Sequence, residues 1–274
     1  MATDVTRNSE VAIAVFVDFE NLALGVQDTK GGRFDIELVL KRLLEKGRIV
    51  AKRAYCDWTR YKQFMHEFHM QGFEMIDIPQ TKVSGKNSAD IRMVVDALDL
   101  CYSKSHIDTF VLLTGDSDFS PLASKLKEND KRVIGCGVRN STSDLLASNC
   151  DEFIFYDDLV REEKRPQRRK PKAAAGKAPE KAAAGDETQK QQEALDLVVE
   201  TVEDLFKERG EEEKVWGSMV KQALKRRKPG FNETYHGFRT FSKLLEAAQA
   251  RGLLQLEHDE KSGGYIVTSL AAEE

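Results

Sequence analysis

Residues 11–22 read VAIAVFVDFENL, and this stretch decides the class of fold. Residues 11–17 form an unbroken apolar run rich in β-branched side chains, which is typical of a strand buried on both faces of a sheet. Asp18 follows that run directly. A strand buried on both faces needs a covering layer on each side, so the stretch predicts a sheet with helices above and below it.

The same kind of pattern continues to about residue 155. We expect further strands at 49–55, 73–78, 109–113, 132–137 and 152–155, and helices at 35–46, 58–70, 88–102, 119–128 and near 143–148. The helix at 88–102 is expected to bury a stripe formed by Ile91, Val94, Val95 and Leu98. Because strands and helices alternate, the sequence predicts an α/β domain with a mostly parallel sheet.

Four aspartates lie at the ends of these elements. Asp18 follows the first strand, Asp116 and Asp118 follow the fourth in LLTGDSDF, and Asp90 opens a helix within KVSGKNSAD. In a parallel sheet, functional groups collect beyond the carboxyl ends of the strands, near the point where strand order reverses. Converging carboxylates repel one another unless cations neutralise them, and oxygen ligands suit Mg²⁺ or Mn²⁺. All four are candidate catalytic groups and metal ligands for hydrolysing a phosphodiester.

Each of these acids also has a purely structural interpretation. Asp118 is placed to cap the helix that follows it, and Asp90 is placed to favour the dipole of its own helix. Asp96 lies six residues after Asp90, so the helical period rotates it away from that face. It falls with Arg92 and Asp99 on a polar face, which favours a solvated position.

The composition sets limits on the class of protein. The chain has 274 residues, of which 41% are hydrophobic and 32% charged, enough for two packed domains. No apolar run approaches the roughly 20 residues of a membrane span, and residues 1–10 lack the apolar segment of a secretory signal. We therefore expect a cytoplasmic protein with no membrane partner. The four cysteines show no C-x-x-C spacing, which favours buried thiols over a zinc site.

The net charge of −4 is unevenly distributed along the chain. Residues 1–160 carry 20 basic and 25 acidic side chains, residues 161–185 carry 9 and 3, and residues 186–274 carry 13 and 18. Apolar periodicity disappears over 161–187, which predicts a basic flexible linker. Its cations either contact a phosphate backbone or only keep the linker soluble. The candidates for RNA contact are Arg165, Arg168, Arg169 and Lys170.

A second, smaller domain is expected at residues 188–274. Helical stripes at 194–206, 215–225 and 238–250 precede two short strands at 253–256 and 265–268, which is the outline of a winged helix-turn-helix. Phe241 is expected in its core. Cations mixed with aromatic residues suit single-stranded nucleic acid, although the same cations are equally suited to solubility. The candidates for RNA binding are Lys225, Arg226, Arg227, Lys228 and Arg239.

Three blocks of the first domain resemble the signatures of the NYN domain, a family of PIN-like nucleases. They are VFVDFENL at 15–22, KNSADIRMVVDALDL at 86–100 and LLTGDSDFSPLASKL at 112–126. The resemblance implies a Rossmann-like PIN fold over residues 1–160 and cleavage of RNA that depends on Mg²⁺ or Mn²⁺. The residues that match the acidic cluster of the family are Asp18, Asp90, Asp116 and Asp118.

The same resemblance implies a second tier of residues. Asn21, in the loop expected after the first strand, and Ser117 lie beside the acidic cluster, and Asp96 matches a further acidic position of the helical block. Lys86 matches a basic residue that precedes that block, where it reaches a phosphate or is an ordinary loop lysine. PIN-like domains often pair, so a homodimer is also left open.

Residues 216–257, followed by GGYIV at 263–267, are similar to the OST-HTH domain, also called LOTUS. That resemblance implies RNA binding or recruitment of a protein partner. The whole chain is then interpreted as a metal-dependent ribonuclease, with a non-catalytic RNA-binding adaptor as the alternative. A nucleotide-binding role is disfavoured because neither G-x-G-x-x-G after the first strand nor G-x-x-x-x-G-K-[ST] occurs.

Overall fold

The computed structural model describes residues 10–27, 33–79, 88–164, 184–209, 214–259 and 263–270. It divides into two compact units, Met1–Pro166 and Gln167–Glu274. The elements of the first unit are β1 (Ala12–Asp18), α1 (Phe19–Gln27), α2 (Ile36–Leu44), β2 (Arg48–Cys56), α3 (Lys62–Met70), β3 (Glu74–Asp77), α4 (Ser88–Ser103), β4 (Thr109–Leu113), η1 (Ser117–Phe119), α5 (Ser120–Glu128), β5 (Arg132–Gly137), η2 (Arg139–Ser141), α6 (Asp144–Asn149), β6 (Glu152–Phe155) and α7 (Tyr156–Lys164).

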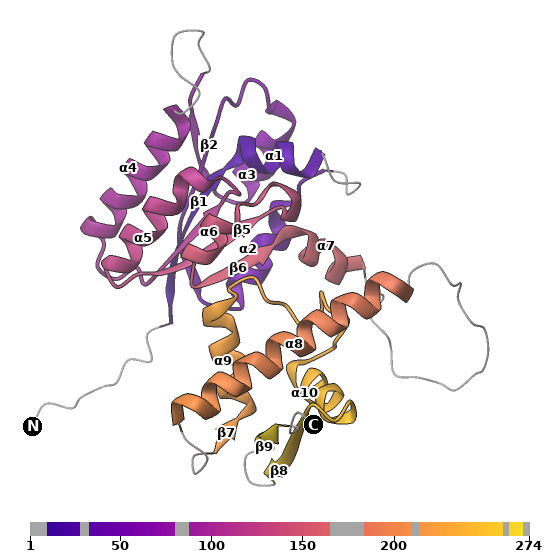
Figure 1. Cartoon of the computed structure of the whole chain (residues 1–274). Coiled ribbons are helices and arrows are strands. Elements are labelled where there is room, and N and C mark those ends of the chain that lie inside the picture. Colours follow the sequence, from indigo (N-terminus) through magenta and orange to yellow (C-terminus); the bar gives the residue numbers. More distant parts are fainter. Residues whose placement is uncertain are drawn as a thin grey trace, which may run out of the picture. The chain divides into compact units, whose positions relative to one another are not determined.

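The strands of the first unit form one sheet in the order β3-β2-β1-β4-β5-β6, and every neighbouring pair is parallel (Figure 1). The chain moves outward from β1 to β3 and then returns to the other side of β1 with β4. Strand order therefore reverses between β1 and β4, where Val17 is in register with Leu113. The carboxyl ends of these two strands flank the crevice in which an open α/β sheet places its functional groups.

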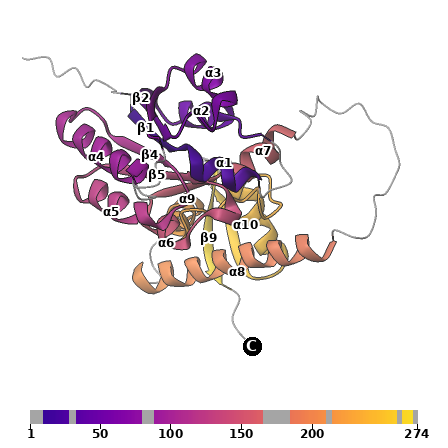
Figure 2. The same cartoon turned by 90° about the horizontal axis from the view of Figure 1, so that it is seen from above.

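Helices cover both faces of this sheet (Figure 2). On one face, Phe19 of α1, Val39 of α2 and Phe68 of α3 pack against β1 residues such as Val15 and Val17. The other face is covered by α4, α5 and α6, which pack against Phe16 and Leu112. The two sets of side chains alternate along β1, as expected for a strand buried on both sides.

Several helices differ from the sequence prediction. The residues after β1 form helix α1 rather than a loop, so Asn21 lies in the first turn of a helix. The prediction for the buried face of α4 is wrong at Ile91 and Val95, which are exposed, whereas Val94 and Leu98 are partly buried against the core. The fully buried face is formed instead by residues such as Met93 and Ala97. Because α4 carries apolar residues on two faces, its periodicity does not distinguish the inner face from the outer one.

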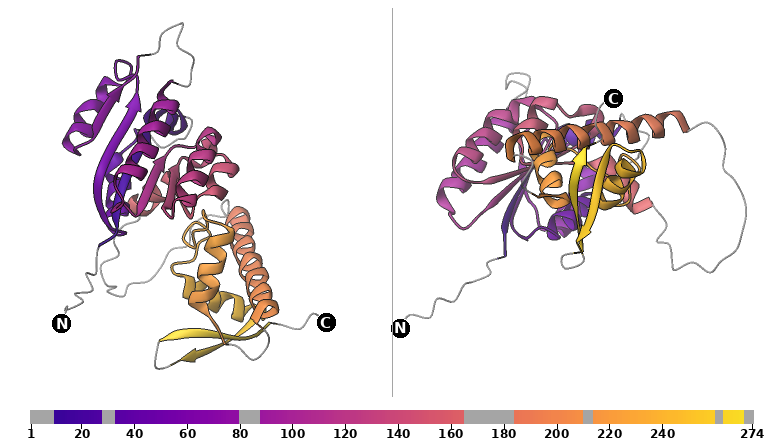
Figure 3. Two further views of the ribbon diagram at one scale, coloured as in Figure 1. Left: turned by 90° about the vertical axis from the view of Figure 1, so that its left-hand side faces the viewer. Right: turned by 60° about the horizontal axis from the view of Figure 1, so that its bottom comes forward.

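The second unit contains, among the described residues, helices α8 (Ala184–Arg209), α9 (Gly217–Arg227) and α10 (Phe241–Ala250) and strands β7 (Val215–Trp216), β8 (Leu254–Asp259) and β9 (Gly264–Leu270). The strands pair antiparallel in the order β7-β9-β8, and the β8–β9 ribbon is visible in Figure 3. The expected helix start at residue 215 is wrong, because Val215 and Trp216 pair with β9.

This unit has a hydrophobic core of its own. Val198 of α8, Leu224 of α9 and Leu244 of α10 are buried together, and Phe241 lies in the same core as expected. The predicted linker at 161–187 is helical at both of its ends, since α7 continues to Lys164 and α8 begins at Ala184. None of the described helices combines the length and the apolar character that crossing a membrane requires.

Candidate acidic site at the switch point

The four predicted aspartates lie at the carboxyl edge of the sheet. Asp18 is the last residue of β1, Asp116 follows β4, Asp118 lies in η1, and Asp90 is in the first turn of α4. Their charges act on one another. Beyond the effect of burial, the charges of Asp90 and Asp116 raise the pKa of Asp18, and burial followed by the charges of Asp116 and Asp118 raises the pKa of Asp90. The fold therefore brings together acids that lie about a hundred positions apart in the sequence.

Asp18 lies at the base of this site and is only 7% exposed. One of its carboxylate oxygens accepts a hydrogen bond from the backbone N–H of Asn21 at 3.3 Å, and the other accepts one from Thr114 Oγ1 at 3.0 Å. Burial, followed by the negative charge of Asp90, raises the pKa of Asp18 to about 7, although both hydrogen bonds act to lower it. A buried carboxylate with acidic neighbours needs an added positive charge to remain ionised at neutral pH.

The loop after β4 fixes the opposite side of the site. The backbone N–H of Gly115 donates to Asn21 Oδ1 at 2.8 Å, and that of Asp116 donates to Thr114 Oγ1 at 3.2 Å. A Cβ atom at Gly115 would lie 2.4 Å from the carbonyl oxygen of Ser141, so only glycine allows this close approach. Sequence reasoning missed the roles of Thr114 and Gly115, although both precede Asp116 in the quoted motif.

The acid that caps the short helix η1 is Asp116 and not Asp118. Asp116 Oδ1 accepts the backbone N–H of Asp118 at 2.9 Å, and the N-terminus of α5 has no side-chain cap. The capping interpretation of Asp118 is therefore wrong. Asp118 is exposed, Asp90 is half-buried, and neither carboxylate accepts a hydrogen bond from the described residues. Their oxygens remain available to a ligand.

Asp96 does not belong to this cluster. Its carboxylate accepts a hydrogen bond from the hydroxyl of Tyr55 at 2.9 Å and another from Arg92 Nε at 2.9 Å. Its side chain is only 14% exposed, so it is neither solvated nor at the acidic site. The rotation expected over six helical residues accounts for this position. Asp96 instead ties α4 to β2 through Tyr55.

The donor set at this edge consists of carboxylate oxygens, which suits Mg²⁺ or Mn²⁺. The acids line the edge at different depths, from the buried Asp18 to the exposed Asp118. Among the described residues, no group of three or more His, Cys, Asp or Glu side chains is already arranged to hold a metal ion. Ser117 is half-buried in η1 beside the acids, and Lys86 lies outside the described residues. All four cysteines are buried free thiols, as expected.

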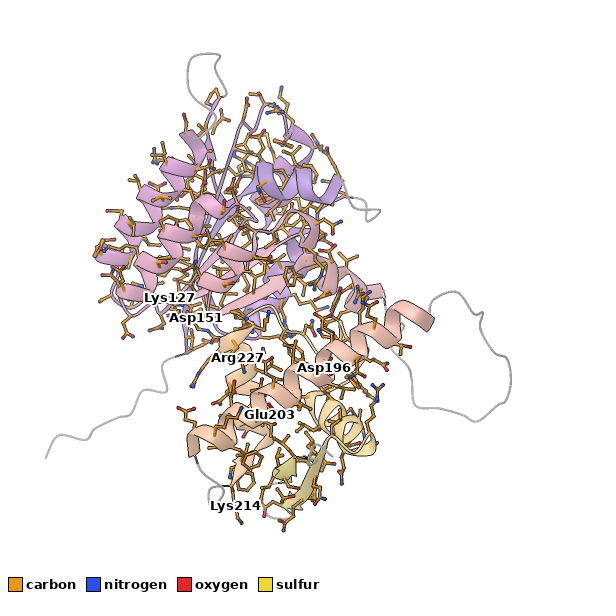
Figure 4. All side chains as sticks on the ribbon, viewed as in Figure 1. Lys127, Asp151, Asp196, Glu203, Lys214 and Arg227 are labelled. Atoms are coloured by element: carbon orange, nitrogen blue, oxygen red, sulfur yellow. The ribbon has the colours of Figure 1, made fainter. Side chains whose placement is uncertain are left out.

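The basic residues predicted to bind RNA in the second unit differ in their availability. Arg227 donates to Glu200 at 2.5 Å and to Asp204 at 2.7 Å, so its guanidinium is held against α8 (Figure 4). Arg226, Lys228 and Arg239 are exposed, whereas Lys225 is half-buried. The predicted linker cations Arg165, Arg168, Arg169 and Lys170 lie outside the described residues.

The aromatic residues near these cations are also more structural than the sequence suggested. His236 is buried, and its Nδ1 lies 2.8 Å from the carbonyl oxygen of Lys190. Its ring stacks on Phe231 with centroids 5.2 Å apart. His236 therefore joins α8 to the segment before α10, and it is not an exposed surface for bases.

Residues 12–157 match the model of the NYN domain. The chain belongs to the NYN-domain family. The described six-stranded parallel sheet fits the PIN-like fold of that family, whose membership indicates a nuclease-type hydrolase. Nucleases of this superfamily generally depend on divalent metal ions. The second unit lies beyond the matched residues.

Two further similarities extend over much of the chain. An uncharacterized protein of Methanocaldococcus jannaschii is 29% identical over 187 residues, which make up 68% of this chain and 72% of that protein. A crystal structure of a protein of unknown function from Vibrio parahaemolyticus has 26% sequence identity and a TM-score of 0.49. It corresponds to 58% of this chain and to 98% of that chain.

Proposed function

We propose that this protein is a metal-dependent ribonuclease that hydrolyses phosphodiester bonds at the acidic edge of its NYN domain. The observation that supports this most directly is the meeting of Asp18, Asp90, Asp116 and Asp118 at the switch point of the sheet. When no positive charge is bound at the acidic edge, the burial of Asp18 among other acids lowers the stability of the folded protein. A site that receives a divalent cation and an anionic substrate explains why that cost is tolerated.

Asp18, Asp116 and Asp118 are the proposed ligands of Mg²⁺ or Mn²⁺, and Asp90 completes the site or orients the attacking water. A bound divalent ion activates water and stabilises the leaving oxygen of a phosphodiester. The protein holds the surrounding groups in place: Thr114 and the backbone of Asn21 orient Asp18, and Gly115 orients the Asn21 amide. Asn21 Nδ2 has no hydrogen bond with the described residues, so it is available to donate to a phosphate oxygen.

The second unit is proposed to be a winged helix-turn-helix of the OST-HTH type that binds RNA together with the linker. Its exposed cations Arg226 and Lys228 support RNA contact, whereas Arg227 is engaged by α8. The acidic first unit has a net negative charge, which disfavours a polyanion. Basic segments outside it are therefore expected to supply most of the affinity for RNA.

One observation favours the alternative, a non-catalytic RNA-binding adaptor. The described acids are not already grouped as three ligands for one ion. An adaptor would bind RNA through the same basic residues and leave the acidic edge without a chemical role. The two functions differ in one outcome, which is whether any RNA is cut in the presence of a divalent metal ion.

The deciding experiment incubates the full chain with labelled single-stranded and structured RNAs in Mn²⁺, in Mg²⁺ and in EDTA. Asp18→Asn and Asp118→Asn are compared with Glu128→Gln, a matched acidic change at the far end of α5, where Glu128 pairs with Lys125. We expect metal-dependent cleavage by the wild type and by Glu128→Gln, and loss of at least about a hundredfold in both Asn variants. Binding without cleavage in every lane supports the adaptor and rejects the ribonuclease.

A further inference from the structure

Helix α4 carries two separate apolar faces. The inner face packs on the sheet through Met93, Ala97 and Leu100. The outer face carries Ile91, Val95 and Tyr102, which are 63%, 55% and 63% exposed, and Leu98 lies between them, partly buried. At about 100° per residue these four positions fall within an arc of roughly 60°, on a different side of the helix from the inner face. The outer face is therefore a continuous apolar stripe and not a scatter of single residues.

The spacing of this outer stripe is that of a helix-pairing seam. Ile91, Val95, Leu98 and Tyr102 follow one another at intervals of four, three and four residues, the spacing with which two helices interlock along a shared stripe. α4 lies beside α5 on one face of the sheet (Figure 1, Figure 2). The stripe faces away from the core, since Ile91, Val95 and Tyr102 are exposed. Contiguous exposed apolar surface of this kind marks an interaction site on a protein.

The charges beside the stripe indicate which partner fits it. Arg92 and Asp99 flank the stripe on the same side, seven residues apart. Arg92 uses Nε for Asp96 and keeps its other guanidinium N–H groups for a second partner, and Asp99 has no ion pair with the described residues. In an antiparallel pair of identical helices, one flank of the first helix lies against the same flank of the second, running in the opposite direction. Arg92 of each copy therefore meets Asp99 of the other. A parallel pair would not bring these charges together.

We propose that α4 pairs antiparallel with α4 of a second copy of this chain around a two-fold axis near residues 96–97. Such an interface is self-complementary, because Ile91 of each copy packs near Tyr102 of the other and Val95 near Leu98. Asp90 lies off the stripe, so both acidic edges stay uncovered, about 20 Å apart along the helix axes. A single helix pair is a small interface, and a dissociation constant in the micromolar range is expected.

Sedimentation velocity on the full chain, from about 1 µM to about 200 µM, tests the pairing directly. We expect the mass to double across this range in the wild type. Val95→Glu places two carboxylates in the seam, and it is expected to weaken association at least about tenfold. The matched control is Met70→Glu, an equally drastic change at a residue 72% exposed on α3, which should associate like the wild type. A wild type that stays monomeric, or a dimer that survives Val95→Glu, overturns the proposal.

A charge exchange tests the antiparallel arrangement. Asp99→Arg alone sets two guanidinium groups against each other in both contacts, and Arg92→Glu alone sets two carboxylates together, so each variant should associate several-fold more weakly. In an equimolar mixture of the two variants, both contacts of the heterodimer again join opposite charges, so the mixture should associate like the wild type. The double variant Arg92→Glu/Asp99→Arg also brings opposite charges together in both contacts of its own dimer and should associate like the wild type. Thermal unfolding confirms that each variant is folded. If the double variant associates no better than either single variant, the antiparallel register is wrong.

Discussion

Two features of the surroundings of Asp18 make it costly for its carboxylate to be charged. It is buried at the end of β1, and it lies within the electrostatic reach of Asp90 and Asp116. Both conditions disfavour the charged carboxylate, which raises its pKa to about 7. The hydrogen bonds from Asn21 and Thr114 oppose this shift and hold the carboxylate in one orientation. Such a residue is poised to respond both to pH and to a bound cation.

The pKa of Asp18 gives a prediction for stability in EDTA. Below about pH 4 the Asp18 carboxyl is protonated in both the folded and the unfolded chain, so its titration does not change the free energy of unfolding there. As the pH rises from about 4 to about 7 the unfolded chain releases this proton before the folded chain does, and the folded state loses stability until the pH exceeds about 7. Asp18→Asn should therefore be more stable than the wild type at about pH 8 by about 1–3 kcal/mol.

Thermal or urea unfolding of both proteins between about pH 4 and about pH 8 in EDTA measures this difference. The advantage of Asp18→Asn should shrink towards the acidic end and should also shrink when excess Mg²⁺ or Mn²⁺ is added, because the ion stabilises only the wild type. A variant less stable than the wild type at the alkaline end in EDTA would contradict the burial cost assigned to Asp18.

At the scale of elements, the same helix or strand serves packing and chemistry at different positions. Helix α9 ends in Lys225, Arg226 and Arg227, and the fold treats these cations differently, since Arg226 is exposed while Arg227 is held in ion pairs. Arg227 bridges Glu200 and Asp204 of α8 and so joins two helices of the second unit. A cluster that looks uniform in the sequence is divided by the fold into an ion-paired part and an exposed part.

This division predicts unequal effects on RNA binding. Arg226→Ala and Lys228→Ala should each weaken binding of a single-stranded RNA several-fold and lower the slope of log affinity against log salt by up to about 1. Arg227→Ala should change the affinity less than about twofold, and it should lower the unfolding free energy by about 0.5–1 kcal/mol through loss of its ion pairs. Fluorescence anisotropy in a salt series measures the affinities. A salt slope that falls more for Arg227→Ala than for Arg226→Ala would refute this assignment.

At the scale of the whole molecule, each unit has its own hydrophobic core. The cores of the first unit lie on the two faces of its sheet, and the core of the second is formed by α8, α9, α10 and their strands. The charges are also divided, because residues 161–185 carry 9 basic and 3 acidic side chains between two acidic segments. Chemistry and RNA affinity are thus expected to be separable along the chain.

A chain that ends at Pro166 tests this separation. Since the acidic edge and both cores of the sheet lie within residues 10–164, the shortened protein should unfold cooperatively and should still cleave RNA at saturating substrate. Its KM for RNA should rise at least about tenfold, because most phosphate-contacting cations have been removed. Steady-state kinetics and calorimetry check both expectations. An unchanged KM would show that the first unit alone holds the RNA.

Much of the acidic site was predictable because its main residues are adjacent to strand ends. Asp18 and Asp116 follow strands that the apolar runs define, and the topology of a parallel sheet then brings them to one edge. The supporting contacts were not predictable. Thr114 reaches Asp18 across 96 positions, and Gly115 reaches Asn21 across 94, so no local pattern reveals either hydrogen bond.

The sequence by itself determined the alternation of strands and helices and the placement of the four acids, because both depend on periodicity and on immediate neighbours along the chain. Only the tertiary structure decided which apolar face of α4 is buried, that Arg227 is bound by α8, and that Asp96 is turned towards Tyr55. These outcomes depend on which distant elements pack together. Helical periodicity defines the faces of an element, but packing chooses the face that meets the core.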